Sequence, residues 1–547
     1  MLLEDYEEFN EAQLKLLERY VTNTRSHIFA LRNLPEVIKG ALFSRYSRSN
    51  LGLRSLFLKE FVSNSDESAF SSIVGIDPQS EPAAQVAAIK KAQNFYDRIL
   101  DGYGDDSIGE LGGAHLAVEN VSMLAAKFLE DSRIGGSPLE KSTRYIYFDQ
   151  KVKGEFLFYR EPVLMTSAYR DLYVNTCNML FETYGRLIQS LTPFFEKLMP
   201  RDPSNSQAAY ATALRAKVLD CLRGLLPAGT LTNMGIYGNG RFFDSLIHKL
   251  HCHNLAEIQD IGKKTYEELS KVIPSFVRRA NMSHKTHQSY AAFVDSMQTE
   301  LQMVAEPLTM HNVLPSSFDM QLPGTRLIGY NPDAVFKVAS ALLFPHVKQS
   351  LHDLETYCRN LPEDELARIL EAAASSRENR RQKSPRGLEF AEFTFEILAD
   401  FGVYRDLHRH RMLTQDRQLL TCDYGFYTPS EIKGTPMEGE YITALQKAKE
   451  AFDIIASALP EEAQYVVPMA FNVRWHFHVN LRALQWLCEL RSSPAGHSSY
   501  RHVAQSMAKQ VSEQFPLFER FFKFVDYEGY EMGRMDQEQR KYAKQQS

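Results

Sequence analysis

The sequence has little of what marks several classes of protein. Six cysteines among 547 residues form no CxxC pair, which disfavours a disulfide framework and suggests a reducing, cytoplasmic compartment. Only 28 glycines and 23 prolines are present, which excludes a collagenous or low-complexity chain. No run of apolar residues approaches the roughly 20 that a membrane span needs, and the acidic start lacks a signal-peptide core. We therefore expect no membrane partner.

An excess of basic residues is also missing. Lys and Arg number 62 against 68 Asp and Glu, so the net charge is -6. A general nucleic-acid-binding surface normally carries a basic excess, so nucleic acid is not expected as a partner. Local groups of arginine could still bind a small phosphorylated ligand. With 44% hydrophobic and 24% charged residues, the chain has the profile of a globular protein long enough for several domains.

Most of the chain has the pattern of amphipathic helix. Segments 5–23, 261–280 and 503–524 place apolar residues at helical spacing. The clearest strand signal is 393–397, where apolar and polar side chains alternate. We predict a helix-rich α/β (α+β) fold.

Three landmarks occur twice along the chain, in the same order. Residues 34–43 resemble 331–344, residues 109–133 resemble 388–411, and Pro227 before Asn239-Gly-Arg241 has a counterpart in Pro468 before Asn480-Leu-Arg482. The offset between copies shrinks along the chain, which indicates unequal loop insertions, most of them around 146–185. We predict two homologous domains, 1–285 and 325–547, joined by a linker at 286–324. Each would be a small, mostly antiparallel sheet with packed helices.

Two clusters of polar residues could carry chemistry. In the first, Arg405 and His408 precede Arg409-His410-Arg411 within two helical turns. This cluster could bind an anion, or it could be a solvated helix end whose cations meet the helix dipole. A metal pair from His408 and His410 is disfavoured, because positions i and i+2 do not share a helix face.

The second cluster is in the first copy. Strand-like alternation would put Glu140, Ser142 and Arg144 on one face of an extended segment. An acceptor, a hydroxyl and a guanidinium suit a phosphorylated, hydroxyl-bearing ligand, and an ordinary surface strand with one ion pair is the alternative. Four further residues lack a second metal-ligand pair and are expected at an exposed helix end: His248, His251, Cys252 and His253.

On these residues the chain resembles the flavin-dependent thymidylate synthases (ThyX). Arg409-His-Arg411 is similar to the family's RHR element, and 388–397 is similar to the LEH…FTF stretch before it. The later part of the motif is replaced in the second copy, at Thr414, Arg417, Leu419, Thr421 and Cys422. The first copy keeps that part, in Ser137, Glu140, Ser142, Arg144 and Tyr145.

Two downstream arginines of the family show the same complementarity. The first copy keeps Arg223 and has Leu250 where the last arginine belongs, whereas the second has Gln464 and keeps Arg491. Neither copy carries the whole motif, and together they carry nearly all of it. The resemblance therefore implies composite sites that draw residues from both copies.

The resemblance implies the reductive methylation of dUMP to dTMP. Methylenetetrahydrofolate would be the one-carbon donor and reduced FAD the reductant, with NADPH reloading the flavin. Matching residue by residue makes Arg491 the catalytic residue and implies no metal. The implied dUMP-binding residues are Glu140, Ser142, Arg144, Arg223 and Arg409. The implied FAD-binding residues are Ser107, Glu110, Asn239, Arg241, Glu389, Arg409, His410, Arg411, Asn480 and Arg482.

The family's active sites lie between the subunits of a homotetramer. A chain with two fused copies would then form a dimer that rebuilds the tetramer. Two other functions stay open. An inactive relative that binds flavin or nucleotide, or serves assembly, is favoured by Trp486 and Leu419 at positions where the family has asparagine and serine. A cleft that binds nucleic acid is disfavoured by the acidic balance.

Overall fold

The computed structural model describes residues 8–34, 36–46, 49–59, 109–132, 134–310 and 324–546. The chain divides into two compact units, each assembled from separate segments. Unit 1 is Met1–Glu119, Ser132–Glu140 and Asn233–Pro315, and unit 2 is Asn120–Asp131, Lys141–Thr232 and Ser316–Ser547. Unit 2 therefore contains parts of both predicted copies, and the predicted boundaries at 285 and 325 do not coincide with the compact units.

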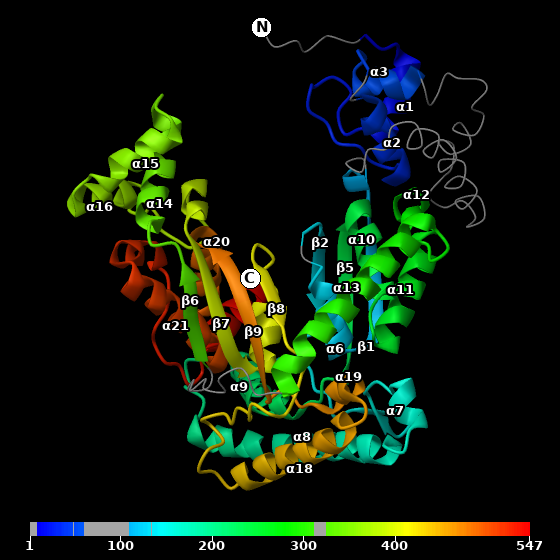
Figure 1. Ribbon diagram of the computed structural model, residues 1–547, viewed down its shortest axis with the longest axis vertical. Coiled ribbons are helices and arrows are strands. Elements are labelled where there is room, and N and C mark those ends of the chain that lie inside the picture. The colour runs from blue at the N-terminus through cyan, green and yellow to red at the C-terminus, as the bar shows by residue number, and fades with distance from the viewer. Residues whose placement is uncertain are drawn as a thin grey trace. The chain divides into compact units, whose positions relative to one another are not determined.

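Unit 1 is built on a three-stranded sheet in the order β1-β5-β2 (Figure 1). The strands are β1 Gly113–Ser122, β2 Gly136–Glu140 and β5 Leu231–Asn239. The last residues of β1 and the first of β5 are counted in unit 2. β2 runs antiparallel to β5, with Gly136 opposite Gly238 and Glu140 opposite Met234. The helices are α1 Glu11–Tyr20, α2 Glu36–Tyr46, α3 Leu53–Phe57, α10 Gly240–His251, α11 Ala256–Leu269, α12 Pro274–Val277 and α13 Lys285–Met310.

Two expectations change in unit 1. Helix α13 covers most of the expected linker, whose residues 311–323 lie outside the described ranges. The helical pattern over 261–280 is interrupted, because α11 ends at Leu269 and α12 begins at Pro274. Proline has no backbone N–H and disfavours helix in the residue before it, so it starts a new helix here.

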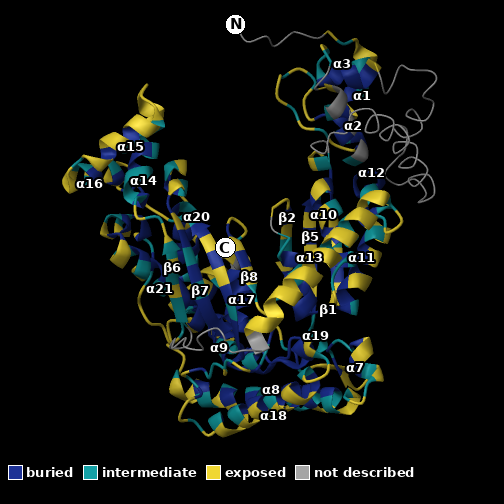
Figure 2. Ribbon diagram, viewed as in Figure 1, coloured by how far each residue is buried: buried dark blue, intermediate teal, exposed yellow. Residues whose placement is uncertain are grey.

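Unit 2 is built on a four-stranded antiparallel sheet in the order β6-β7-β9-β8. The strands are β6 Gly324–Tyr330, β7 Glu392–Asp400, β8 Thr414–Arg417 and β9 Asn472–Asn480. β7 pairs with β9 over its whole length, from Glu392 opposite Asn480 to Asp400 opposite Asn472. Phe393, Phe395 and Ile397 are completely buried, which confirms the predicted strand (Figure 2).

Helices cover this sheet and extend beyond it. Those from the first copy are α6 Met123–Glu130, α7 Pro162–Thr166, α8 Arg170–Leu198 and α9 Gln207–Leu222. Those from the second copy are α14 Ala334–Leu343, α15 Leu351–Arg359, α16 Glu363–Ala372, α17 Phe401–Leu407, α18 Glu438–Ala456, α19 Pro460–Ala463, α20 Leu481–Arg491, α21 Ser498–Gln514 and α22 Met535–Gln546. The pattern over 503–524 thus continues past α21 as a 3-10 segment, Pro516–Phe522.

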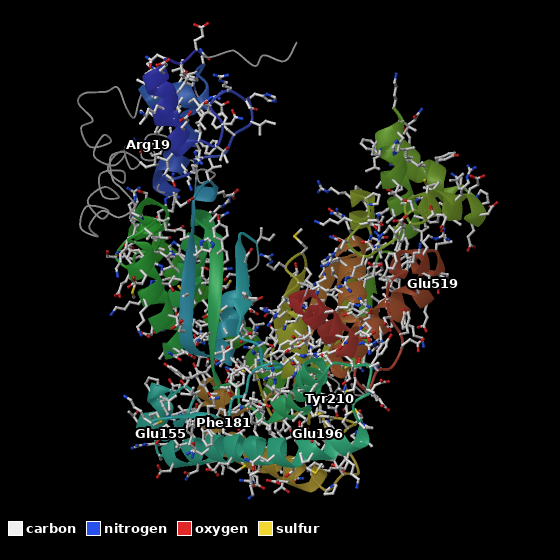
Figure 3. All side chains as sticks on the ribbon, turned by 180° about the vertical axis from the view of Figure 1, so that it is seen from behind. Arg19, Glu155, Phe181, Glu196, Tyr210 and Glu519 are labelled. Atoms are coloured by element: carbon white, nitrogen blue, oxygen red, sulfur yellow. The ribbon has the colours of Figure 1, made fainter. Side chains whose placement is uncertain are left out.

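The first-copy helices of unit 2 carry the inserted segment. The small hairpin of β3 (Lys151–Val152) and β4 (Glu155–Phe156) precedes α7. Phe181 of α8 stacks on Phe156 with ring centroids 5.2 Å apart, and Tyr210 of α9 donates to the carbonyl oxygen of Met199 at 2.8 Å (Figure 3). Helix α8 also packs against α18 of the second copy. The expected insertion at 146–185 is therefore part of the hydrophobic core of unit 2.

The two copies meet in unit 2 through equivalent residues. Pro227 and Pro468 face each other in an antiparallel bridge. The amide of Ala228 donates to the carbonyl of Val467 at 2.8 Å, and the amide of Met469 donates to the carbonyl of Leu226 at 2.9 Å. Each bond is the counterpart of the other when the copies are exchanged. This reciprocity is that of a two-fold, isologous contact.

None of the helices within the described ranges combines the length and apolar character that crossing a bilayer requires. All six cysteines are free thiols, and only Cys252 is less than fully buried.

Candidate functional site

Helix α9 and the segment after β2 contribute a buried ion pair to unit 2. Arg144 donates to both carboxylate oxygens of Asp220, from Nε at 2.7 Å and from Nη2 at 2.6 Å. Burial alone would raise the pKa of Asp220, but the guanidinium of Arg144 holds that pKa well below its usual range. Asp220 is therefore a fixed negative charge that orients Arg144.

A second buried pair joins the two copies. Arg223 follows α9, and its Nη1 donates to Oδ2 of Asp406 in α17 at 2.9 Å. Burial would raise the pKa of Asp406, yet Arg223, Arg144, Arg409 and other guanidiniums hold it far below its ordinary value. The Nη2 of Arg223 is buried and has no hydrogen-bond partner among the described residues. A buried donor of this kind is costly unless a ligand satisfies it.

The end of α20 supplies the third arginine. Asn480 caps the helix by accepting from the amide of Ala483 at 2.9 Å, and Arg491 is the last helical residue. The Nε of Arg491 donates to Nε2 of His410 at 2.9 Å. Burial and the charge of Arg491 keep the pKa of His410 well below its ordinary value, so His410 is neutral and carries its proton on Nδ1.

Tyr500 connects two of these arginines. The guanidiniums of Arg144 and Arg491 each lie 5.6 Å from the centre of its ring. The hydroxyl of Tyr500 also accepts from Nη1 of Arg144 at 3.0 Å. We call Arg144, Arg223 and Arg491 the arginine cluster. It lies entirely within unit 2, and its members come from both copies.

Two further residues predicted to bind dUMP, Glu140 and Ser142, are not part of the arginine cluster. Glu140 is the last residue of β2 and lies in unit 1, whereas Ser142 lies in unit 2. The hydroxyl of Ser142 accepts from the backbone amide of Arg144 at 3.2 Å. The predicted alternation of Glu140, Ser142 and Arg144 on one strand face was wrong, because the strand ends at Glu140 and a turn follows.

A pocket of about 440 Å³ lies beside the third arginine, in unit 2. Six of its residues were implied as FAD ligands: Glu389, Arg409, His410, Arg411, Asn480 and Arg482. Trp486, which the family resemblance places near the flavin, also lines the pocket. Further lining residues were not anticipated: Arg377, Arg380, Gln382, Lys383, Ser384, Met412, Leu413, Ala483 and Gln485. The basic run at 377–383, just before the motif stretch 388–397, is the sequence signal that could have indicated several of them.

An ion pair at the wall of this pocket has a counterpart in unit 1. In unit 2, Nη1 of Arg482 lies 2.8 Å from Oε1 of Glu389. In unit 1, Nη1 of Arg241 lies 2.8 Å from Oε1 of Glu110, and Asn239 caps α10 as Asn480 caps α20. The implied FAD ligand Ser107 lies outside the described residues.

Two expectations about histidines need correction. The RHR residues were expected within a helix, but α17 ends at Leu407 and Arg409–Arg411 lie in the loop before β8. His248 was expected to be exposed, but it is buried in unit 1, with Nδ1 at 2.8 Å from Nδ1 of His287. Across the described ranges, no three His, Cys, Asp or Glu side chains are arranged to hold a metal ion.

Fold and site together describe a helix-rich α+β protein whose guanidinium groups suit phosphorylated ligands. The family model "Thymidylate synthase complementing protein" matches residues 62–275 and 326–517 of the chain. The chain belongs to this family, and the two matched segments confirm the predicted tandem arrangement.

Close relatives extend over the whole chain. A UPF0159 protein of Chlamydia pneumoniae is 54% identical over 98% of both chains, and one of Chlamydia muridarum is 53% identical over 98% of this chain and 99% of its own. A UPF0159 protein of Thermoplasma acidophilum is 31% identical over 92% of this chain and 99% of its own. The names of these relatives state no reaction.

Proposed function

We propose that the chain is a flavin-dependent thymidylate synthase that methylates dUMP to dTMP. The observation that carries the proposal is the arginine cluster, because Arg144 of the first copy and Arg491 of the second share Tyr500. Arg223 of the first copy binds Asp406, on which the charges of the other two arginines also act. Neither copy alone has this set. Family membership adds the reaction class.

The buried charges of the cluster suit a nucleoside monophosphate. A phosphate dianion would satisfy the unpartnered Nη2 of Arg223, and Asp406 and Asp220 hold the guanidiniums in place before it binds. Arg491 would face the oxygen edge of uracil and stabilise negative charge that develops during activation of C5. Neutral His410 accepts from Nε of Arg491, and together with the side chain of Tyr500 it fixes the orientation of that guanidinium.

The pocket beside the cluster fits FAD by its donor set. Arg380, Lys383, Arg409 and Arg411 offer cations for a diphosphate, and Trp486 offers a planar surface for a ring. Asn480, Arg482 and Glu389 would complete this binding site. When bound, the flavin supplies the reducing electrons that turn the transferred methylene group into a methyl group, and NADPH restores them. The chain's own residues bind and orient both ligands.

The number of sites per chain follows from the composite arrangement. Each chain holds one complete arginine cluster, so dUMP should saturate near one molecule per 547 residues.

We further propose that two chains associate, giving four copies in the assembly. Light scattering coupled to size-exclusion chromatography tests the dimer.

The decisive experiment is reconstitution with the purified chain. Protein purified with added FAD should be yellow and should form dTMP from dUMP, methylenetetrahydrofolate and NADPH. Calorimetric titration should give about one dUMP per chain. Two equivalent nucleotides per chain would contradict the composite site. Flavin and dUMP binding without dTMP formation, and no rescue of a thymidine auxotroph, would instead identify an inactive relative, for which Trp486 in the pocket wall is the structural reason.

A further inference from the structure

The C-terminal segment 525–546 lies outside the residues that the family model matches. Its helix α22 packs on α9, the helix that carries Asp220. The hydroxyls of Tyr542 and Thr212 are 3.1 Å apart, and the side-chain oxygen of Gln539 accepts from the amide of Ser206 at 3.1 Å. The segment is thus attached to the element that positions the arginine cluster.

The start of the segment is tied to the loop after Arg491. The amide of Asp526 donates to the hydroxyl of Ser492 at 3.0 Å. The carboxylate of Asp526 accepts from the hydroxyl of Tyr530 at 2.9 Å and from Nη2 of Arg501 at 3.3 Å. These bonds hold the start of the C-terminal segment across the loop 492–497.

Gly533 fits that path for a steric reason. A Cβ atom at this position would lie 2.0 Å from the carbonyl oxygen of Pro494, which is a clash with backbone. Any other residue at 533 would push the segment away from the loop. The close approach places the next residue, Arg534, against Ala495, to whose carbonyl oxygen its Nε donates at 3.2 Å.

Arg534 reaches the ion pair of the cluster. Its side chain is only 7% exposed, and its Nη2 lies 3.5 Å from Oδ2 of Asp220, the carboxylate that already binds Arg144. The Nη2 of Arg144 also donates to the carbonyl of Ala495, at 3.3 Å. Two guanidiniums therefore share one carboxylate.

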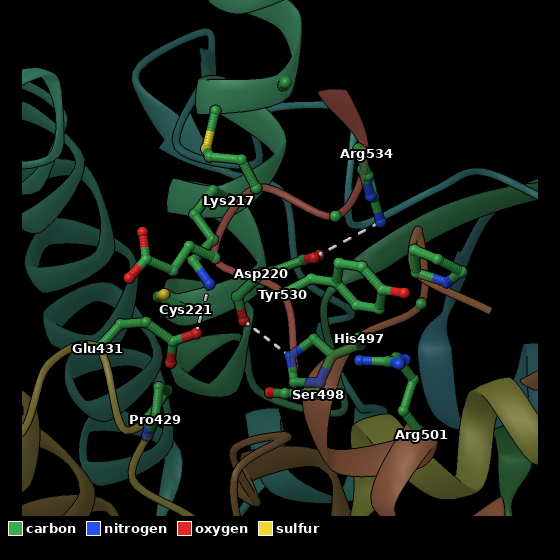
Figure 4. A pocket seen from close by; sticks show the side chains of 16 residues that line it. Lys217, Asp220, Cys221, Pro429, Glu431, His497, Ser498, Arg501, Tyr530 and Arg534 are labelled. Atoms are coloured by element: carbon green, nitrogen blue, oxygen red, sulfur yellow. Dashed lines mark hydrogen bonds and ion pairs between the residues drawn. The ribbon is translucent and has the colours of Figure 1, made fainter. Parts of the chain in front are cut away.

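One donor of Arg534 is left over. Its Nη1 is buried and finds no hydrogen-bond partner in the described parts of the chain. Arg534 lines a cavity of about 50 Å³ (Figure 4). Its other charged lining residues are Lys217, Asp220, Glu431, Arg501 and Glu531, and Lys217 is paired with Glu431. That space is several times what one water molecule needs. An anionic oxygen would satisfy this buried donor.

We propose that Arg534 is a further substrate-binding residue, which the C-terminal segment supplies to hold the phosphate of the nucleotide with Arg144 and Arg223. This inference rests on the proposed function for the identity of the nucleotide. The shared chemistry is a phosphate group, on dUMP or free in solution. A guanidinium delivered by a segment outside the family match would make phosphate binding depend on that segment.

The test is calorimetry on the full-length chain with dUMP, deoxyuridine and inorganic phosphate. Arg534→Met and Gly533→Ala should weaken dUMP and phosphate binding by roughly tenfold to a hundredfold, the range for a hydrogen bond to a charged group. Deoxyuridine, which lacks phosphate, should bind as to the parent. Arg534→Lys should restore part of the loss. Arg540→Met is the matched control, because Arg540 is exposed on α22.

The outcomes separate this inference from the proposed function. Unchanged dUMP affinity in Arg534→Met would overturn it, and so would equal losses for dUMP and deoxyuridine, which indicate a purely structural role. A parent chain that binds phosphate through Arg534 but binds no dUMP would refute the proposed function and leave the phosphate site standing.

Discussion

Arg223 and Gln464 are equivalent positions of the two copies, and both are almost fully buried in unit 2. Arg223 pairs with Asp406 at 2.9 Å and keeps a buried donor for which the described residues offer no partner. Gln464 donates to the carbonyl oxygen of Glu461 at 3.0 Å and accepts from the amide of Leu420 at 3.2 Å. Arg223 keeps a buried donor without a partner among the described residues, whereas the amide of Gln464 is satisfied by its neighbours.

The difference shows how a duplicated site can divide its work. In the composite site that we propose, each functional residue is needed only once, so the second position is free to become structural. A neutral amide can be buried with local hydrogen bonds at little cost, whereas a buried guanidinium needs carboxylates around it. The same division holds for Arg491 and its counterpart Leu250, which is completely buried in unit 1.

Separating the copies should have the largest effect. We expect fragments 1–285 and 325–547, expressed alone, to form no dTMP, because the cut parts Arg223 from Asp406 and Pro227 from Pro468. Asp406 would lose the guanidinium that compensates its burial. Product formation and dUMP calorimetry on each fragment provide the measurement.

Co-expression is the control for this separation. Fragments that fold together should recover part of the activity, because the interface between the copies can reform. An active single fragment would show that one copy suffices, and it would remove the division of work between them.

Arg491→Ala should have the next largest effect. The loss of charge stabilisation on the pyrimidine is expected to lower kcat by roughly a hundredfold to a thousandfold. The dUMP affinity should change far less, because the interaction strengthens in the transition state. Steady-state kinetics and calorimetry separate the two, with Arg540→Ala as the exposed control. A kcat equal to that of the parent would remove Arg491 from the mechanism.

Replacing Arg223 by glutamine, the residue at the equivalent position 464, tests the comparison directly. Arg223→Gln should lower the free energy of unfolding by about 3–5 kcal/mol, because it leaves Asp406 buried without its main partner. It should also abolish measurable dUMP binding.

The matched change on the other side is Gln464→Ala. It should cost only about 1–3 kcal/mol through the unsatisfied amide of Leu420, and it should leave dUMP affinity unchanged. Urea unfolding and calorimetry on both variants test this. Equal losses of dUMP affinity would mean that both positions serve ligand binding.

Local signals in the sequence were enough to predict several parts of the structure. Alternation predicted the strand around Phe395, and the family motif pointed to six residues that line one pocket of unit 2. The repeat of Pro227 and Pro468 predicted two copies, and the structure adds that these prolines face each other. Each of these features depends on neighbours in sequence or on a repeated pattern.

The partners of the arginines could not be predicted in this way. Asp220 and Asp406 become partners only when α9 and α17 pack, and no spacing in the sequence announces that contact. The end of β2 at Glu140 and the end of α17 at Leu407 are set by tertiary packing, and periodicity does not mark them. Arg534 lies outside every recognised motif.

The smallest expected effect concerns the residues that cap equivalent helices. Ser122 caps α6 in the first copy, and Asp400 caps α17 in the second by accepting from the amide of Val403 at 3.0 Å. Burial raises the pKa of Asp400 from 3.8 to about 6, although Arg223 opposes the shift. Its folded-state pKa lies above the unfolded value, so the stability that Asp400 contributes below about pH 4 is lost as pH rises through 6.

Asp400→Asn should therefore stabilise the chain at pH 7.5 and not at pH 4. Asparagine keeps the cap and removes the buried charge. The gain in free energy of unfolding should be at most about 3 kcal/mol, the equivalent of about two pKa units. Ser122→Ala is the matched control and should cost about 1 kcal/mol at both pH values, because it removes a neutral cap. Urea unfolding at the two pH values distinguishes the variants. A less stable Asp400→Asn chain at pH 7.5 would show that ionised Asp400 gains more from Arg223 than its burial costs, and the second copy would then depend on a charged cap where the first uses a neutral one.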